Sequence, residues 1–191
     1  MEAMSMTEDK QRQIVAQRFG LYLGLATIVM LFVALTSAYL VRQGAGNWLF
    51  VKMPIQFLIS TGIILASSVT MYLSKKAYKE MQLSRYRILI WSTLVLGFLF
   101  VAAQYEGWLA LGNGGVYLDG NPGGSFIYAI TWVHVVHVVV GLLLMAIVAI
   151  KTSLNNYSTD RAHNLGLIST YWHFVDGLWI YLFIFFQIKF F

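Results

Sequence analysis

Ionisable side chains occur inside the apolar stretches of this chain, and their types and spacing could support chemistry. His134 and His137 are three positions apart, as are His173 and Asp176, so each pair would share one face of a helix. Imidazoles from two helices could hold a b-type haem, and together with a carboxylate they could hold a metal ion. They could equally hydrogen-bond one another across helices, with Asp176 accepting a hydrogen bond from an imidazole.

Gln104 and Glu106, toward the end of another apolar stretch, complete the candidate polar residues. The chain has no cysteine, which excludes disulfides, thiolate metal sites and covalent c-type haem attachment. It also has no glycine-rich phosphate loop beside a strand and no activated serine. The residues alone therefore assign no catalytic group, and they leave packing, haem binding and metal binding as competing roles for the histidines.

The elements that carry these residues are set by apolar length. Apolar types make up 59% of the 191 residues and charged types 11%, and a bilayer core of ~30 Å needs about 20 apolar residues in a helix. We predict an all-α integral membrane bundle of five transmembrane helices that follows a polar segment over residues 1–18. A single domain over residues 19–191 would hold these helices, at 19–41, 54–74, 87–111, 125–150 and 165–188.

The distribution of positive charge predicts the orientation of the bundle. Five helices would place the N-terminus and the second and fourth loops on one side, and ten of the 13 Lys and Arg residues fall there. Cytoplasmic loops collect positive charge, so the N-terminus is predicted to be cytoplasmic and the C-terminus external. The excess of basic residues is therefore explained by the orientation of the chain in the membrane, and nucleic acid is not an expected partner. The ten are Lys10, Arg12, Arg18, Lys75, Lys76, Lys79, Arg85, Arg87, Lys151 and Arg161, against Arg42, Lys52 and Lys189.

Small residues recur along the first predicted helix at helical spacing, and they form what we call the small-residue seam. Such seams let two helix backbones approach closely in lipid. The seam could pack within this chain or dock against another subunit. Its members are Gly20, Gly24, Thr27, Ala34 and Ala38.

The fourth and fifth predicted helices carry blocks that resemble subunit III of the haem–copper oxidases, the cytochrome c oxidase subunit III family. Weaker similarity comes from the second helix, at Pro54 and residues 65–68, and from the third, at Leu96, Gly97 and Gln104. The resemblance covers essentially the whole chain and matches the family's short, five-helix form. The two blocks are Thr131-x-x-His134-x-x-His137-Val138-x-x-Gly141 and Tyr171-Trp172-His173-Phe174-Val175-Asp176-x-x-Trp179.

The resemblance implies a non-catalytic subunit of a respiratory terminal oxidase, a complex that reduces oxygen to water and pumps protons. It implies no haem or copper in this chain, which would lie in the partner catalytic subunit I. It also implies a structural phospholipid in a cleft, support of proton uptake, and other oxidase subunits or a larger supercomplex as partners. The expected location is a plasma membrane, bacterial rather than mitochondrial. His134, His137, His173 and Asp176 would then form a structural polar cluster between helices.

Alternatives remain beside that expectation. A quinol-oxidase version or a homologue associated with nitric oxide reductase would look the same, because donor contacts lie on other subunits. A b-type haem electron carrier using the same histidines belongs to a different class. The chain also departs from the family pattern at two positions. At the first of them, Ile28 stands where a buried glutamate is usual. Gly107 stands where a glutamate usually follows Gln104 by three residues, with Glu106 one place short.

Overall fold

The computed structural model describes residues 2–154 and 159–188, and every element in this range is a helix. Residues 189–191, which belong to the predicted domain and include Lys189, lie outside this range. Five helices here are long and apolar enough to cross a membrane, which confirms the predicted all-α membrane bundle. They are α1 (Glu2–Gly44), α2 (Ile55–Lys79), α3 (Leu83–Asn113), α4 (Pro122–Leu154) and α5 (Thr159–Ile188).

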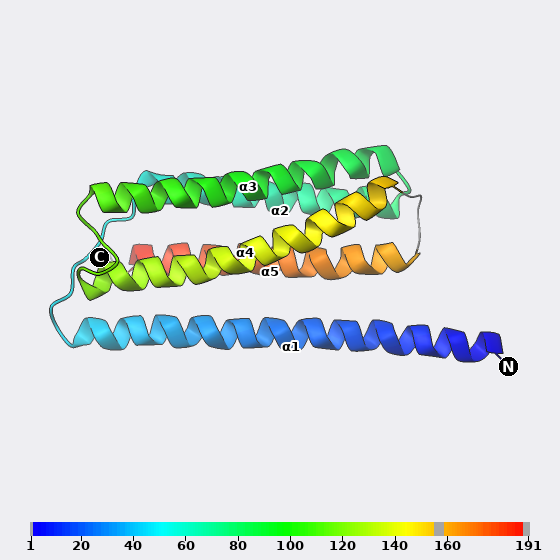
Figure 1. Ribbon diagram of the computed structural model, residues 1–191, viewed down its shortest axis with the longest axis horizontal. Coiled ribbons are helices and arrows are strands. Elements are labelled where there is room, and N and C mark those ends of the chain that lie inside the picture. Colours follow the sequence, from blue (N-terminus) through cyan, green and yellow to red (C-terminus); the bar gives the residue numbers. More distant parts are fainter. Residues whose placement is uncertain (1, 155–158, 189–191) are drawn as a thin grey trace.

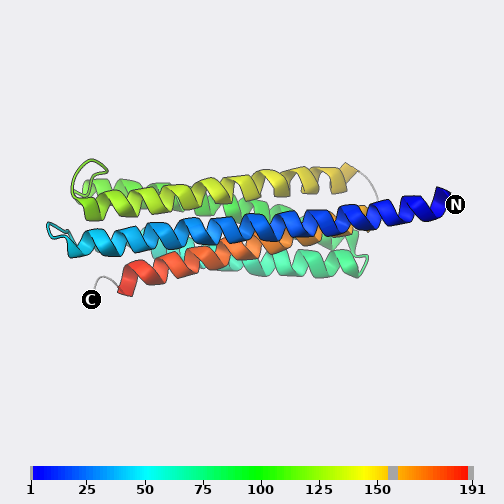
Figure 2. The same cartoon turned by 90° about the horizontal axis from the view of Figure 1, so that it is seen from below.

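The helices run roughly antiparallel and form two unequal parts (Figure 1). Helices α2, α3, α4 and α5 pack around a common core, whereas α1 lies outside them and contacts α4 and α5. Seen from below, α1 runs along the line between α4 and α5 (Figure 2). At one end of the bundle lie the N-terminal part of α1, the α2–α3 turn, the end of α4 and the start of α5, and we call this the basic end.

Helix α1 begins earlier than predicted. It includes the polar segment 2–18, which continues without a break into the apolar part. Apolar length marks only the portion of a helix that a membrane can cover. The preceding stretch contains Glu, Lys, Gln, Arg and Ala, which all favour helix, so the helix extends beyond that portion. With 43 residues and ~1.5 Å per residue, α1 projects past its neighbours at the basic end (Figures 1 and 2).

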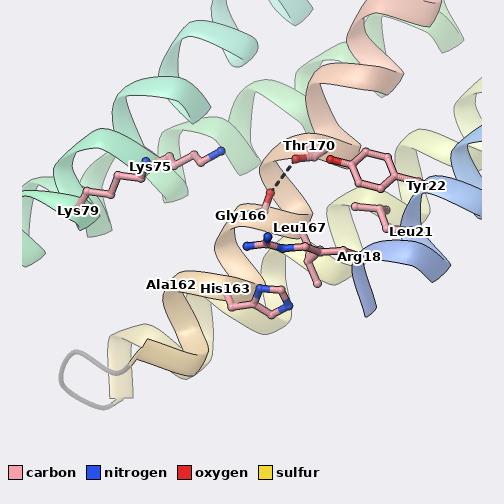
Figure 3. A pocket seen from close by; sticks show the side chains of 10 residues that line it. All are labelled: Arg18, Leu21, Tyr22, Lys75, Lys79, Ala162, His163, Gly166, Leu167 and Thr170. Atoms are coloured by element: carbon pink, nitrogen blue, oxygen red, sulfur yellow. Dashed lines mark hydrogen bonds between the residues drawn. The ribbon is translucent and has the colours of Figure 1, made fainter. Parts of the chain in front are cut away.

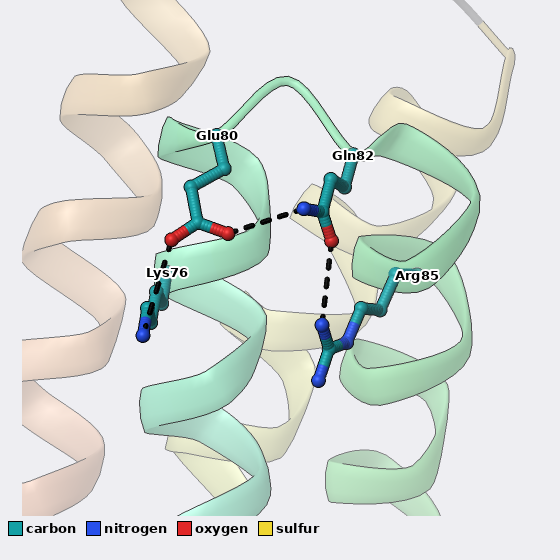
Figure 4. Close-up of polar contacts among 4 residues, drawn as sticks. All are labelled: Lys76, Glu80, Gln82 and Arg85. Carbon is teal, nitrogen blue, oxygen red and sulfur yellow. Dashed lines mark hydrogen bonds and ion pairs between the residues drawn. The ribbon is translucent and has the colours of Figure 1, made fainter.

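The turn between α2 and α3 is short and held by several contacts. Met81 adopts a left-handed conformation with φ of 61°, and the rings of Tyr78 and Tyr86 meet at 4.8 Å on either side of it. On the outer surface Glu80 accepts a hydrogen bond from Gln82 (Figure 4). Because the flanking ion pair from Lys76 is exposed and 3.9 Å long, it contributes at most about 1 kcal/mol, and the aromatic contact is the main brace.

The connections at the opposite end are tied together by one side chain. Asn121 precedes α4, and its Oδ1 accepts hydrogen bonds from the backbone N–H groups of Leu49 and Gly123. Its Nδ2 donates to the Asn47 carbonyl. Pro122 begins the helix, where a missing N–H costs little. Asn121 therefore caps α4 and attaches the α1–α2 connection to it.

The small-residue seam does not pack within the chain. Helix α1 instead buries a neighbouring stripe in which Leu25, Phe32 and Tyr39 recur every seven residues. All five seam residues are exposed, and a Cβ added at Gly20 or Gly24 would meet nothing within 4 Å. Sequence cannot choose between the faces because nearly every face of a transmembrane helix is apolar. Intrachain packing of the seam is thus wrong, and docking against another subunit stays a prediction.

Candidate functional site

Trp172 occupies the centre of the four-helix core. Its side chain is fully buried on α5, and the indole fills the space left by two glycines on neighbouring helices. A Cβ added at Gly97 of α3 would lie 2.9 Å from the ring, and one at Gly141 of α4 would lie 3.2 Å from it. Gly97, Gly141 and Trp172 all belong to the stretches that carry the family resemblance. The structure shows that they meet at one point and set the spacing of three helices.

Hydroxyl groups on α2 receive polar side chains from α5. The indole N–H of Trp172 donates to Ser67 Oγ at 2.9 Å, and the indole N–H of Trp179 donates to Thr61 Oγ1 at 2.9 Å. In addition, Ser68 Oγ and His173 Nδ1 share a hydrogen bond of 2.7 Å. These contacts hold α2 and α5 in register, and we call them the hydroxyl ladder.

The hydroxyl ladder was not predicted from the sequence. Thr61 and Ser67 were not among the candidate site residues, yet each accepts a hydrogen bond from an indole of α5. A shared spacing in the sequence could have predicted it. Trp172 and Trp179 are seven residues apart, and the pairs of hydroxyl residues at 60–61 and 67–68 are also seven residues apart. A shared seven-residue period keeps two antiparallel helices facing each other over two turns.

His134 packs as an aromatic ring within the core. It is fully buried, and neither ring nitrogen has a hydrogen-bond partner among the described residues. The ring lies 5.2 Å from Trp179, 5.9 Å from Phe100 and 6.3 Å from Phe32, centroid to centroid. These rings come from α5, α3 and α1, so His134 joins the outer helix to the core. A charged imidazolium would be costly in such surroundings.

His137 is engaged with backbone one turn away. Its Nδ1–H donates to the Val133 carbonyl at 2.7 Å, and its own carbonyl accepts a hydrogen bond from the Tyr171 hydroxyl at 2.9 Å. The ring also meets Phe32 edge-on at 5.7 Å. His137 thus helps to fix α4 against α5 and α1.

The predicted hydrogen bond from an imidazole to Asp176 is wrong. The Asp176 side chain is 2% exposed, yet neither carboxyl oxygen has a hydrogen-bond partner among the described residues. His173 turns to Ser68 on α2 instead, because that hydroxyl faces it across the helix interface. The four residues therefore do not form one hydrogen-bonded cluster. They take part in separate contacts along α4 and α5.

The two polar residues of α3 have different environments. Gln104 is fully buried and its Nε2 donates to Ser60 Oγ at 3.0 Å, so it links α3 to α2 beside the hydroxyl ladder. Glu106 is exposed. At Gly107 a Cβ would come within 2.8 Å of the Phe57 ring, so the close packing of α2 and α3 leaves no room for the glutamate usual in the family. Ile28, at the other departure from the family pattern, is half-buried and packs against the core.

Within residues 9–152 and 162–188, whose side chains the structure describes, no group of three or more His, Asp or Glu residues could hold a metal ion. The polar side chains are used mainly for helix-to-helix contacts. Haem ligation by His134 and His173 would require both imidazoles to face one slot. His134 is surrounded by aromatic rings and His173 is bonded to Ser68.

Comparison with known proteins agrees with this architecture. The family model described as cytochrome c oxidase subunit III matches residues 7–189. A probable cytochrome c oxidase subunit 3 of Nocardia farcinica is 30% identical over 172 residues, which cover 86% of this chain and 83% of that protein. Cytochrome c oxidase subunit 3 of Thermostichus vulcanus is 29% identical with the same coverage. That of Locusta migratoria is 32% identical over 69% of this chain but 49% of its own length. The chain belongs to the cytochrome c oxidase subunit III family.

Proposed function

We propose that this chain is a non-catalytic subunit III, which flanks a catalytic subunit that holds the haem and copper. The observation that carries the proposal is the hydroxyl ladder, in which Trp172, His173 and Trp179 are committed to hydroxyl groups of α2. Buried polar groups that serve as helix contacts are not free to bind a redox centre. The chain belongs to an oxidase complex as a multi-pass membrane protein, and its own contribution would be structural.

The role in the complex would be to stabilise the catalytic subunit, to hold phospholipid and to sustain proton uptake during turnover. The small-residue seam supports an external contact, because all five of its residues are exposed on α1. Exposed small residues give a partner helix or a lipid chain close access to the backbone. Elsewhere the bundle exposes many large apolar side chains, as a lipid-facing surface requires.

Deletion of this chain tests the proposal. The remaining oxidase, purified from its native membrane, should keep its haem absorption spectrum and initial rate, whereas its activity should decay faster with each turnover. The wild-type complex is the control, and in it this chain should co-migrate with a haem-containing catalytic subunit. Loss of the haem bands from the deletion strain's complex, or a Soret band in the isolated wild-type chain, would contradict a non-catalytic role.

We further propose that the basic end of the bundle faces the cytoplasm of a bacterial cell. The support is the positive-charge count, and the absence of native cysteine makes a direct test possible. Leu118→Cys in the α3–α4 loop should react with a membrane-impermeant maleimide in intact cells. Ser84→Cys at the start of α3 should react only after the membrane is permeabilised. The opposite labelling pattern would place the N-terminus outside.

A further inference from the structure

Asp176 is an acidic side chain close to the middle of the membrane. It follows Ala162, the first residue of the span on α5, by 14 positions and precedes Ile188, the last, by 12. At ~1.5 Å per residue these intervals correspond to about 21 Å and about 18 Å along the helix. A hydrocarbon core of ~30 Å extends only ~15 Å to either side of its midplane. Asp176 therefore lies deep within the hydrocarbon region, far from the headgroups of both leaflets.

The Asp176 carboxyl is also enclosed by the protein itself, since the side chain is 2% exposed. Trp172 and Trp179, which lie about one turn before and after it on α5, are both fully buried. The Trp179 ring meets Phe57 of α2 at 6.1 Å and Phe100 of α3 at 5.4 Å. The two indoles close the helix interface on both sides of the carboxyl, so bulk water does not reach it.

No hydrogen bond compensates this carboxyl. Neither of its oxygens has a hydrogen-bond partner among the described residues. Ser68 of α2 lies close to Asp176, but the Ser68 hydroxyl is engaged in the hydrogen bond of 2.7 Å with His173 Nδ1. An unpaired carboxylate in an apolar interior is so costly that the group keeps its proton instead.

The titratable groups around this carboxyl cannot supply a counter-charge at alkaline pH. His173 lies one turn away on α5, and His134 of α4 packs against Trp179 at 5.2 Å. Both imidazoles lose positive charge, rather than gain it, as the pH rises. Lys75 of α2 follows Ser68 by seven positions, about 10 Å along the helix. Among the described residues of α1, α2, α3 and α4, no charged side chain acts on the carboxyl.

We propose that Asp176 is a neutral carboxylic acid in the assembled oxidase, and that its ionisation at alkaline pH loosens α5 from α2 and releases the chain. In the packed state the carboxyl holds its proton, because burial penalises the carboxylate. In the loosened state water solvates the carboxylate, and the proton passes to the solvent. Stability that depends on a bound proton is fully present at low pH and is lost as the pH rises. The interface between α2 and α5 thus acts as a pH-sensitive lock on the subunit.

The test uses the complete, detergent-solubilised oxidase. Asp176→Asn replaces the acid by an uncharged group of the same shape, and Asp176→Leu is a second uncharged variant in case the amide prevents assembly. Glu106→Gln is the matched control, because Glu106 is an exposed carboxyl on α3 of the same chain. Each complex is incubated at one temperature over a pH series, and the ratio of released to retained chain is measured. The haem spectrum verifies that the catalytic subunit stays intact.

In wild type and Glu106→Gln, the ratio of released to retained chain should rise with pH by up to about tenfold per pH unit, the limit for one linked proton. In Asp176→Asn and Asp176→Leu the rise should be much smaller. The infrared spectrum of wild type should contain the C=O band of a protonated carboxyl, shifted in D₂O and missing from Asp176→Asn. An equal pH dependence in wild type and the Asp176 variants would overturn the inference. So would an infrared spectrum in which no protonated-carboxyl band disappears with Asp176.

Discussion

Trp172→Ala should release this subunit from the oxidase at a markedly lower temperature than wild type, with the haem content of the catalytic subunit unchanged. The indole is fully buried between Gly97 and Gly141 and donates to Ser67. Truncating a buried tryptophan to alanine costs about 3–5 kcal/mol, through lost contacts and the cavity left behind. The Ser67 hydroxyl would also lose the indole that donates to it, which adds to the cost.

Thermal release from the detergent-solubilised complex measures this effect, with retained subunit III quantified after each heating step. Trp132→Ala is the matched control because Trp132 lies on the same bundle but is 55% exposed. Its ring stacks on Trp108 at 5.1 Å, a contact that contributes about 0.5–1.5 kcal/mol. A release temperature equally low for both variants would show that Trp172 has no special role in the core.

Gly97→Ala and Gly62→Ala should change stability in opposite directions. At Gly97 the new methyl group would lie 2.5 Å from Leu142 Cδ2 and 2.9 Å from the Trp172 ring. Adding a methyl to a filled core typically costs about 1–3 kcal/mol. At Gly62 of α2 nothing lies within 4 Å of an added Cβ. The better helix propensity of alanine should then stabilise α2 by up to about 1 kcal/mol.

The same thermal-release measurement distinguishes the two glycine variants. Leu142 is flexible enough to move, but the indole of Trp172 is held by its hydrogen bond to Ser67, so we expect the strain at Gly97 to persist. A double variant, Gly97→Ala with Trp172→Phe, offers a check, because a smaller ring would leave room for the methyl. If Gly97→Ala is as stable as Gly62→Ala, the contact between the Trp172 indole and Gly97 is not what sets the spacing of α3 and α5.

Much of the architecture follows from the sequence because bilayer thickness fixes how long an apolar helix must be. Residues 54–74 and 165–188 were predicted as helices and are contained in Ile55–Lys79 and Thr159–Ile188 to within a residue. The start of α1 was predicted 17 residues too late, since apolar length cannot show where a polar helix begins outside the membrane. The family was also predicted correctly from the sequence, because the blocks around His134 and Trp172 have a characteristic residue pattern.

Only the tertiary structure decided which partner each polar residue takes. Sequence spacing put His173 and Asp176 on one face of a helix, and the expected hydrogen bond from an imidazole to Asp176 proved wrong because Ser68 of α2 faces His173. One cavity at the basic end is lined by Arg18, Lys75 and His163 (Figure 3), and this grouping was equally hidden, because the three residues come from three helices that are far apart in the chain. Charge counting predicted that Arg18 and Lys75 lie at the same end of the bundle, but the distances between these side chains depend on how the helices pack. Helix length and charge bias are local properties of the chain, whereas contacts between helices depend on the rotation of each helix about its own axis, which a sequence apolar on nearly every face does not specify.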